Sequence, residues 1–390
     1  MPYVRGLGRA LVCFSAALGL FSVFVATLPS SSAGATPIED GAPWVVPMTA
    51  DSFEFNGQGH RFEQYRGRDA LYLEAGRAWV KGSDLRDGTI EFDLAIPEVR
   101  GFSGVMFRGV DAGNSEHFYV RHHQSGNPDA SQYTPVYNGV SGWQIYAGQG
   151  FTAAFELTHV RWMHIRLDIN GDRAAVYVDS NEPVLIVDDL QRDPVSGLVG
   201  VNAGGAHFAN ITITPGSPMI PAAEKVATPE ADAEVEPVTI DQWQVSSAFA
   251  EDLVAEATTI SAADLRIDSW TALDTTHRGI ANLSRLAAPR PANTVVAAVT
   301  LRSDGDKVAR ARFGFSDRVR VFLNGRLLYS GNDTYLTRDY RYLGTMGLFD
   351  EVALPLEDGD NELWFAVSES FGGWGIVAAI APLDGVEVQQ

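Results

Sequence analysis

The chain of 390 residues has a single cysteine, Cys13, and few basic side chains, with 29 lysines and arginines against 49 aspartates and glutamates. The formal net charge of −20 repels phosphate backbones, so the composition argues against nucleic-acid binding and suits neutral glycans better. The sequence also lacks GxSxG, HExxH and phosphate-binding glycine motifs. Their absence excludes the common serine-hydrolase, zincin and nucleotide-binding classes.

The lone cysteine lies in a segment that has the features of a secretory signal peptide. An apolar run over Ala10–Leu28 follows two arginines, and Ala33–Ala35 offers a small-x-small cleavage site. We predict that residues 1–35 are removed and that the protein is periplasmic or secreted, with no stable membrane insertion after cleavage. An uncleaved anchor is the alternative. The mature chain would then have no disulfide and no cysteine-based metal site.

A proline-rich stretch divides the rest of the sequence into two parts. Five prolines occur between residues 214 and 237, separated mainly by alanine and glutamate. Such a composition resists regular packing and prefers an extended conformation. We therefore predict one domain at 36–213 and another at 238–390, joined by a linker at 214–237.

Alternating apolar and polar residues indicate β-strands in both predicted domains. Between residues 162 and 178 this alternation continues on both sides of Asn170-Gly171, and a similar pattern surrounds Asn324-Gly325. Asn-Gly between alternating segments is the strongest local signal for a β-hairpin, because a type I′ turn needs positive φ at both central residues. No long helical period competes with this pattern. We therefore predict an all-β protein with two β-sandwich, or jelly-roll, domains.

One strand-like segment of the first domain holds acidic candidates for catalysis. Its alternation places Glu91 and Asp93 on the polar face of the strand. Glycoside hydrolases use a pair of carboxyls beside the scissile bond, and Glu91, Asp93 and Glu116 are the candidates here. An ordinary strand with a solvated polar face is the favoured interpretation. The next residue on that face is Ala95, and Pro97 interrupts the strand before a third acid could follow.

One turn of the first domain offers oxygen ligands for an ion. Asp111, Asn114 and Glu116 supply carboxylate and amide oxygens of the kind that calcium prefers. A polar loop with an Asx turn and no ion is the favoured interpretation. The sequence therefore predicts no cofactor, with calcium as the alternative.

Aromatic side chains among small polar residues are the candidates for carbohydrate binding. One aromatic-rich segment contains Tyr137, Trp143 and Tyr146. Sugars present apolar C–H faces and hydroxyl edges, so they suit amphipathic rings that lie beside polar groups. Arg108 and Arg121 are the expected polar partners. The same segment would serve equally well as a flap packed on the sandwich, and both interpretations stay open.

Several stretches between about residues 70 and 213 carry a resemblance to a known superfamily, namely GTIEFDL, SGVMFRGVD, EHFYVRHH, RWMHIRLDINGDRAAVYVD and GLVGVNAGGAHFANITI. They resemble the concanavalin A-like lectin/glucanase superfamily and, within it, the 3-keto-disaccharide hydrolase group. The resemblance implies a curved β-sandwich that binds or cleaves glycans. Laminarinase-type members carry Glu-x-Asp-x-x-Glu, of which this chain has only the first two acids, Glu91 and Asp93.

In the second domain, SDRVRVFLNGRLLYSG, LPLEDGDNELWFAV and ESFGGWG are similar to galactose-binding-like jelly rolls, such as the accessory domains of β-galactosidases. This likeness implies either sugar binding or packing beside a catalytic unit. Trp374 is the candidate for sugar contact in this domain. A strand end where backbones pack closely is the alternative role of its glycine-rich surroundings.

These observations predict an exported carbohydrate-binding protein that recognises an oligo- or polysaccharide through an aromatic-lined cleft of its first β-sandwich. The alternative is a glycoside hydrolase, of the 3-keto-disaccharide hydrolase or glucanase type, that uses carboxylates of the first domain. A structural or partner-binding module without a glycan site is the third interpretation.

Overall fold

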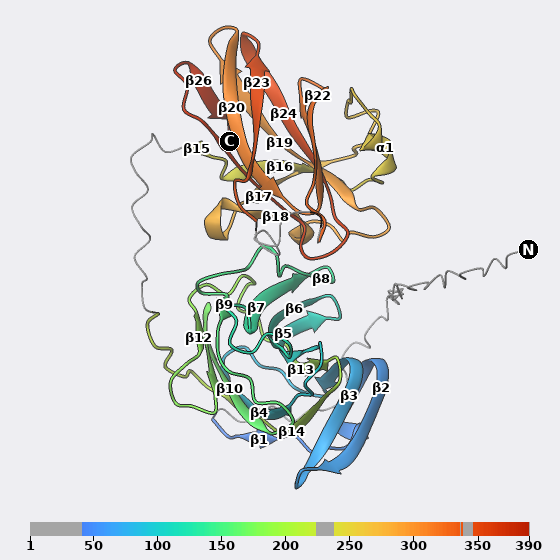
Figure 1. Cartoon of the computed structure of the whole chain (residues 1–390), viewed down its shortest axis with the longest axis vertical. Coiled ribbons are helices and arrows are strands. Elements are labelled where there is room, and N and C mark those ends of the chain that lie inside the picture. The colour runs from blue at the N-terminus through green and yellow to red at the C-terminus, as the bar shows by residue number, and fades with distance from the viewer. Residues whose placement is uncertain (1–40, 224–237, 336, 338–345, 390) are drawn as a thin grey trace, which may run out of the picture. The chain divides into compact units, whose positions relative to one another are not determined.

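The computed structural model describes residues 41–223, 238–335, 337 and 346–389, and most of its regular structure is β-strand (Figure 1). The predicted signal peptide and most of the predicted linker lie outside these residues. The described strands form three sheets, one from residues 44–215 and two from residues 238–389. The prediction of an all-β protein with two β-sandwiches is confirmed. Among the described residues, no helix has both the length and the apolar character needed to cross a membrane.

The first sandwich is built from strands β1 to β14, which pair antiparallel in one sheet. Their bounds are β1 (Trp44–Val45), β2 (Phe53–Tyr65), β3 (Arg68–Val80), β4 (Gly88–Ala95), β5 (Phe102–Asp111), β6 (Asn114–Arg121), β7 (Ser131–Tyr137), β8 (Val140–Ser141), β9 (Thr152–Ala153), β10 (Met163–Asn170), β11 (Arg173–Val178), β12 (Leu185–Val187), β13 (Leu198–Ala203) and β14 (Ala206–Pro215). The strand order is β12-β11-β10-β4-β14-β3-β13-β5-β6-β7-β8, with β1, β2 and β9 paired to β14, β3 and β7. A 3-10 turn, η1 (Ala50–Ser52), precedes β2.

The long strand β3 connects the two layers of this sandwich. Its residues Ala70–Leu73 pair with β14, whereas Gly76–Trp79 pair with β13. At the change of partner, Gly76 has a φ of 116° and lies opposite Gly57 of β2, where an added Cβ would come within 2.6 Å of the Gly57 Cα. Glycine at this position therefore allows the strand to leave one layer and enter the other.

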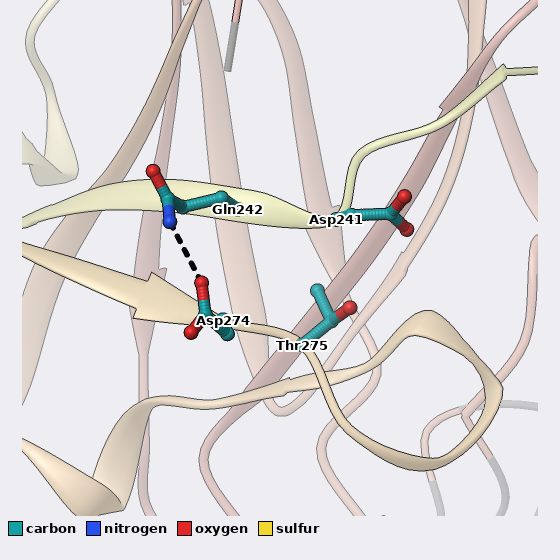
Figure 2. Close-up of a pocket in the computed structure, with 4 residues that line it drawn as sticks. All are labelled: Asp241, Gln242, Asp274 and Thr275. Atoms are coloured by element: carbon teal, nitrogen blue, oxygen red, sulfur yellow. Dashed lines mark hydrogen bonds between the residues drawn. The ribbon is translucent and has the colours of Figure 1, made fainter.

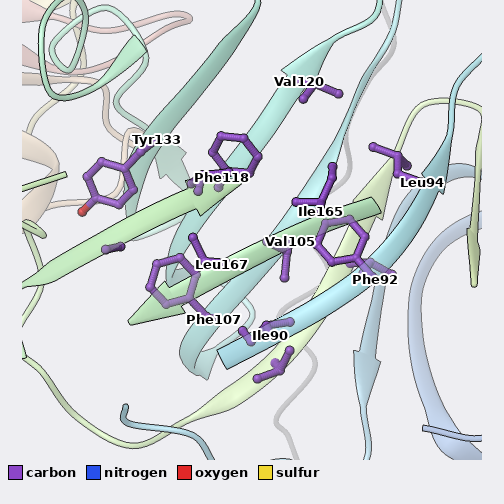
Figure 3. Close-up of a cluster of buried hydrophobic side chains, with 14 of the residues drawn as sticks. Ile90, Phe92, Leu94, Val105, Phe107, Phe118, Val120, Tyr133, Ile165 and Leu167 are labelled. Carbon is purple, nitrogen blue, oxygen red and sulfur yellow. The ribbon is translucent and has the colours of Figure 1, made fainter. Parts of the chain in front are cut away.

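Apolar side chains of the two layers meet in the core of the first sandwich (Figure 3). Ile90, Phe92 and Leu94 of β4 have no exposed surface, which is the face that their alternation predicts. Phe107 of β5 and Phe118 of β6 belong to the same buried cluster from the other layer. Burial of each such side chain stabilises the fold by about 1.5–3 kcal/mol.

The second sandwich has two sheets. Its strands are β15 (Val238–Thr239), β16 (Gln242–Ser246), β17 (Trp270–Asp274), β18 (Ala281–Asn282), β19 (Thr294–Ser303), β20 (Lys307–Phe315), β21 (Arg318–Leu323), β22 (Arg326–Asn332), β23 (Asp350–Leu356), β24 (Gly359–Ser368), β25 (Gly375–Ile380) and β26 (Val386–Gln389). The smaller sheet has the order β15-β25-β20-β23, with β18 on β25, and the larger has the order β17-β16-β19-β24-β21-β22, with β26 on β19. Three short helical segments complete it: α1 (Asp252–Ala255), η2 (His277–Gly279) and η3 (Leu283–Arg285).

Large aromatic side chains connect the two sheets of the second sandwich. Phe313 of the smaller sheet lies 5.3 Å from Phe365 of the larger sheet, measured between ring centroids. Trp243 of β16 packs edge-on against the same phenylalanine at 5.5 Å. All three side chains have no exposed surface, so they form the centre of this core.

Both predicted hairpins are present, but only one has the predicted turn. Asn324 and Gly325 are the two central residues between the paired Leu323 and Arg326, and both have positive φ, as a type I′ turn requires. In the first sandwich, by contrast, Asn170 pairs with Arg173, so that the central residues are Gly171 and Asp172. Only Gly171 has positive φ there.

Candidate functional site

A group of polar and aromatic side chains lies on the outer face of β5, β6, β7 and β13. In β6, the residues His117, Tyr119 and Arg121 alternate with core residues, so they point away from the core. Their cross-strand partners continue the same face: Tyr119 lies opposite Gly104 of β5 and Gln132 of β7, and Gly104 lies opposite Asn202 of β13. We call this surface the Tyr119 face, and define it by Phe102, His117, Tyr119, Arg121, Gln132 and Asn202.

Hydrogen bonds fix the polar groups of the Tyr119 face in one network. The Tyr119 hydroxyl donates to Gln132 Oε1 at 2.8 Å and accepts from Arg121 Nη2 at 3.2 Å. Arg121 also donates to Gln132 Oε1, and Gln132 Nε2 donates to the carbonyl oxygens of Trp143 (2.8 Å) and Tyr146. The network therefore ties the aromatic-rich segment to β6 and β7, and it holds Arg121 in one orientation.

Two titratable groups of the Tyr119 face are uncharged at neutral pH, and burial moves the pKa of each further from neutrality. It lowers the pKa of His117 to about 3, although a hydrogen bond of 2.7 Å between its Nε2 and Asn202 Oδ1 opposes the change. It raises the pKa of Tyr119 to about 12. The face thus combines a neutral imidazole, a neutral phenol and two amides with one fixed guanidinium.

Exposed rings border these polar groups. Phe102 is 38% exposed and packs edge-on against Tyr119, with ring centroids 6.0 Å apart. The exposed His123 lies 5.6 Å from Phe102 between ring centroids, also edge-on. His117 is 4.8 Å from Tyr119. An apolar ring beside neutral donors and acceptors is the combination that sugar recognition needs.

The predicted ligand residues of the aromatic-rich segment contribute mainly by packing. Tyr146 is 0% exposed and packs 5.4 Å from Phe151. The Tyr137 hydroxyl donates to the carbonyl of Gln191, and the guanidinium of Arg192 lies 4.6 Å from its ring. Trp143 is half-buried, and its carbonyl belongs to the network of the Tyr119 face. Most of this segment therefore agrees with one of the two interpretations that the sequence leaves open, namely a flap that packs on the sandwich.

Arg108 lies apart from the Tyr119 face, in the interior. It has a φ of 49° at an irregularity in the pairing of β5 with β6, and it is almost fully buried. Its Nε donates to the carbonyl of Arg86 at 2.8 Å, and its Nη2 donates to Asp87 Oδ1 at 2.9 Å and to the carbonyl of Gly171 at 2.6 Å. Arg108 thus connects the loop before β4 to the loop between β10 and β11, and it does not lie beside Arg121.

Glu91 and Asp93 share the outer face of β4, as alternation predicts, but the expectation of a solvated face is wrong for Asp93. This side chain is 4% exposed. Its Oδ2 lies 2.8 Å from Arg68 Nη1 and accepts from Asn210 Nδ2 at 2.6 Å, and its Oδ1 lies 3.0 Å from His164 Nδ1. The other imidazole nitrogen of His164 lies 3.4 Å from Glu91 Oε1. Partners from three neighbouring strands thus surround the Asp93 carboxylate.

Glu116 points into the core and not into a turn, which corrects the expectation that it neighbours Asp111 and Asn114. It is 0% exposed, and its carboxylate accepts from the Tyr133 hydroxyl at 2.7 Å and from the backbone N–H of Arg192 at 3.1 Å. Burial is the main cause that raises its pKa to about 7. Glu116 therefore shares no face with Glu91 and Asp93.

The turn itself is an Asx turn. Asp111 Oδ1 accepts from the backbone N–H of Gly113 at 2.7 Å and from Asn114 Nδ2 at 3.0 Å. In the described part of the chain, no group of three or more His, Cys, Asp or Glu side chains is arranged to hold a metal ion. Because Glu116 points into the core, the three predicted calcium ligands do not meet at this turn.

Trp374 lies in the core of the second sandwich. It has no exposed surface, and its indole N–H donates to the carbonyl of Val367 at 3.0 Å. This placement agrees with a closely packed strand end.

The sequence indicated Arg121 and Trp143 as candidates, but it did not indicate Tyr119, Gln132 and Phe102 on the Tyr119 face. The alternation in EHFYVR was the available signal, because it places Tyr119 and Arg121 on one side of a strand.

No family model and no curated protein matches this sequence. Among solved structures, the chain is similar to the carbohydrate binding module CBM66 from Bacillus subtilis, with 17% identity and a TM-score of 0.32 over 45% of this chain and 98% of that chain. A protein of unknown function with a galectin-like fold from Bacillus subtilis matches with 13% identity and a TM-score of 0.35 over 45% and 97%. The β-glucanase from Bacillus licheniformis matches with 12% identity and a TM-score of 0.32 over 45% and 98%. Likeness this distant does not identify a ligand.

Proposed function

We propose that this protein is an exported, periplasmic or secreted carbohydrate-binding protein that holds a neutral oligo- or polysaccharide on the Tyr119 face. The observation that supports this proposal best is the exposed ring of Phe102 beside neutral groups that hydrogen bonds hold in place. Sugar hydroxyls both donate and accept, so neutral His117 and Asn202, which are half-buried, suit them as partners. Gln132 is fully buried and instead orients Tyr119 and Arg121 through its hydrogen bonds. The net charge of −20 disfavours anionic glycans.

The arrangement of the carboxylates favours binding over hydrolysis. A retaining glycosidase needs two carboxyls about 5 Å apart and an inverting one about 6.5–9.5 Å apart, on either side of the scissile bond. Glu116 is enclosed in the core, and Asp93 is occupied by Arg68, Asn210 and His164. Of the three acids that the sequence names, these contacts leave only Glu91 available, so the second carboxyl that hydrolysis requires is missing from this set.

Binding and turnover can be measured on residues 36–390 with a panel of neutral polysaccharides, such as β-1,3-glucan, xylan and galactomannan, and with 3-keto-disaccharides. We expect binding without product release. Phe102→Ala should lower the affinity about tenfold, which is the size of one aromatic contact. Arg121→Met should also weaken binding, because it removes the charge and loosens the Tyr119 network. Phe349→Ala is the matched control, since Phe349 is an exposed ring of the second sandwich.

Three results would contradict the proposal. The first is that no glycan of the panel binds, and the second is that Phe102→Ala and Arg121→Met bind as the unchanged protein does. The third is product release that Glu91→Gln abolishes, which would establish the hydrolase alternative.

A further inference from the structure

The second sandwich has a groove on the outer face of its larger sheet. It encloses about 580 Å³, within the range of about 300–1,000 Å³ that is typical of small-molecule sites. Side chains of four neighbouring strands contribute most of the chemistry of its walls. They are Gln242 and Gln244 of β16, Trp270 of β17, Thr300 of β19, and Glu362 and Trp364 of β24.

The groove arises because one of three residues that lie side by side on adjacent strands is small. Gln244 lies opposite Ala298 of β19, and Ala298 lies opposite Trp364 of β24. The small alanine between a long and a large side chain leaves space above the sheet. Trp243 and Val245, the neighbours of Gln244 along β16, point into the core. The strand therefore cannot rotate about its axis or shift by one residue without exposing these side chains.

Two tryptophans form an aromatic wall of this groove. The rings of Trp270 and Trp364 lie 5.4 Å apart between centroids, with 58° between their planes. Trp270 is 38% exposed, although its large ring would gain from burial. An indole that remains open to water beside a second indole offers a platform for the C–H face of a sugar.

A second hollow adjoins the groove at Gln242. It is an open depression of about 530 Å³ that is lined by Asp241, Gln242, Asp274 and Thr275 (Figure 2). Gln242 Nε2 donates to Asp274 Oδ1 at 2.7 Å, which leaves the second oxygen of this carboxylate for other donors (Figure 2). Amide, hydroxyl and carboxylate groups thus continue from the tryptophans along the ends of β16 and β17.

We propose that the groove and this hollow form a second saccharide site, which takes a neutral glycan chain. One sugar unit stacks on Trp270 and Trp364, and hydroxyls of the adjacent units bond Gln244, Gln242 and Asp274. None of the described residues that line the two hollows is a lysine or an arginine, whereas Asp241, Asp274 and Glu362 are acids. This charge excludes sulfated and uronic-acid glycans.

The second site is independent of the Tyr119 face, since it is built from the second sandwich alone. Where the same polysaccharide fits both sites, binding at one raises the effective concentration at the other. A long chain would then be held more tightly than a short oligosaccharide of the same units.

The test uses residues 36–390 and titration calorimetry with the neutral polysaccharides named above and their short oligosaccharides. Trp270→Ala should lower the affinity at one class of sites about tenfold, and Gln244→Ala should weaken the same class. Gln244→Ala keeps the test decisive where the loss of an indole disturbs folding, because Gln244 lies on the surface. Phe349→Ala, an exposed ring outside the groove, is the matched control.

The outcomes separate this inference from the proposed function. Loss in Trp270→Ala and Gln244→Ala, with Phe102→Ala unchanged, supports the second site and contradicts the Tyr119 face. Unchanged binding in both groove variants overturns the second site, whatever Phe102→Ala does. Tighter binding of a polyuronide than of neutral glycans at the groove, or binding of a neutral peptide in place of any glycan, also overturns it.

Discussion

Glu116 gives the sharpest test of the structure, because burial alone should make the stability of the protein depend on this residue and on pH. Its pKa is raised from an ordinary 4.5 to about 7 in the folded state. Between these values the folded chain holds a proton that the unfolded chain has released. The free energy of unfolding should therefore fall as pH rises from about 4.5 to about 7, and Glu116 should add no further change at higher pH.

The size of the effect follows from the pKa difference. Each pKa unit corresponds to about 1.4 kcal/mol, so the rise from 4.5 to about 7 predicts a loss of about 3 kcal/mol across this window. Glu116→Gln cannot ionise, and its amide can still accept from the Arg192 N–H and bond the Tyr133 hydroxyl. The variant should therefore lose none of this stability as pH rises.

The measurement is urea unfolding of the unchanged protein and of Glu116→Gln at several pH values from 4.5 to 8, at constant ionic strength. Other titrating groups cancel in the difference between the two proteins. We expect this difference to move by about 3 kcal/mol in favour of the variant as pH rises. Glu98→Gln, an exposed carboxyl, should show no such trend. A difference that stays constant within about 0.5 kcal/mol would refute the argument from burial.

Two further predictions concern residues whose surroundings differ from expectation. Asp93→Ala should destabilise the protein by about 2 kcal/mol in urea unfolding at pH 7, because it removes the buried carboxylate that accepts from Asn210 and pairs with the partly exposed Arg68 and His164. Glu91→Gln on the same face should change stability by no more than about 0.5 kcal/mol, and equal effects of the two would contradict this assignment. Trp374→Ala should cost about 4 kcal/mol, since it empties a fully buried site. The exposed Phe371→Ala should cost less than about 1 kcal/mol, and a Trp374→Ala variant of similar stability would be inconsistent with the described core.

Strand alternation predicts which side chains are buried where both faces have distinct neighbours. It places Ile90, Phe92 and Leu94 in the core correctly. The Asn-Gly rule is weaker, because it depends on the register of the strands. In the first sandwich, the pairs Leu167–Val176 and Ile169–Ala174 keep the apolar faces aligned, and this register moves the turn one residue beyond the Asn170-Gly171 pair.

The hairpin of β2 and β3 shows why some strands give little signal. Residues 53–65 form β2, yet most of its side chains are exposed and its sequence lacks a regular alternation. It even contains Asn56-Gly57, which pairs within the strand with Arg77 and Gly76 instead of forming a turn. An exposed strand is held mainly by backbone hydrogen bonds, which any sequence can make, so composition reveals it poorly.

Charged residues that become buried are harder to predict, because their partners lie far away in the chain. Asp93 meets His164 and Asn210, which are 71 and 117 residues away along the sequence. Glu116 differs, since it has the same parity as Phe118 and its inward orientation could have been deduced. The alternation rule therefore predicts orientation, whereas burial of the outer face depends on tertiary contacts.

The residues of both proposed sites alternate with core residues along their strands, so they lie on the faces that point away from the core, and this has a physical reason. A residue that faces the core is fixed by packing, so Tyr146 and Trp374 are large aromatic side chains with no surface left for a ligand. A residue one position away is free of that demand while the same strand still holds its backbone rigidly. The half-buried His117 precedes the buried Phe118, and the half-buried Trp364 precedes the buried Phe365. Large or amide side chains at such positions expose apolar area to water unless a ligand covers it. Their position is therefore a stronger indication of glycan contact than the aromatic content of a segment alone.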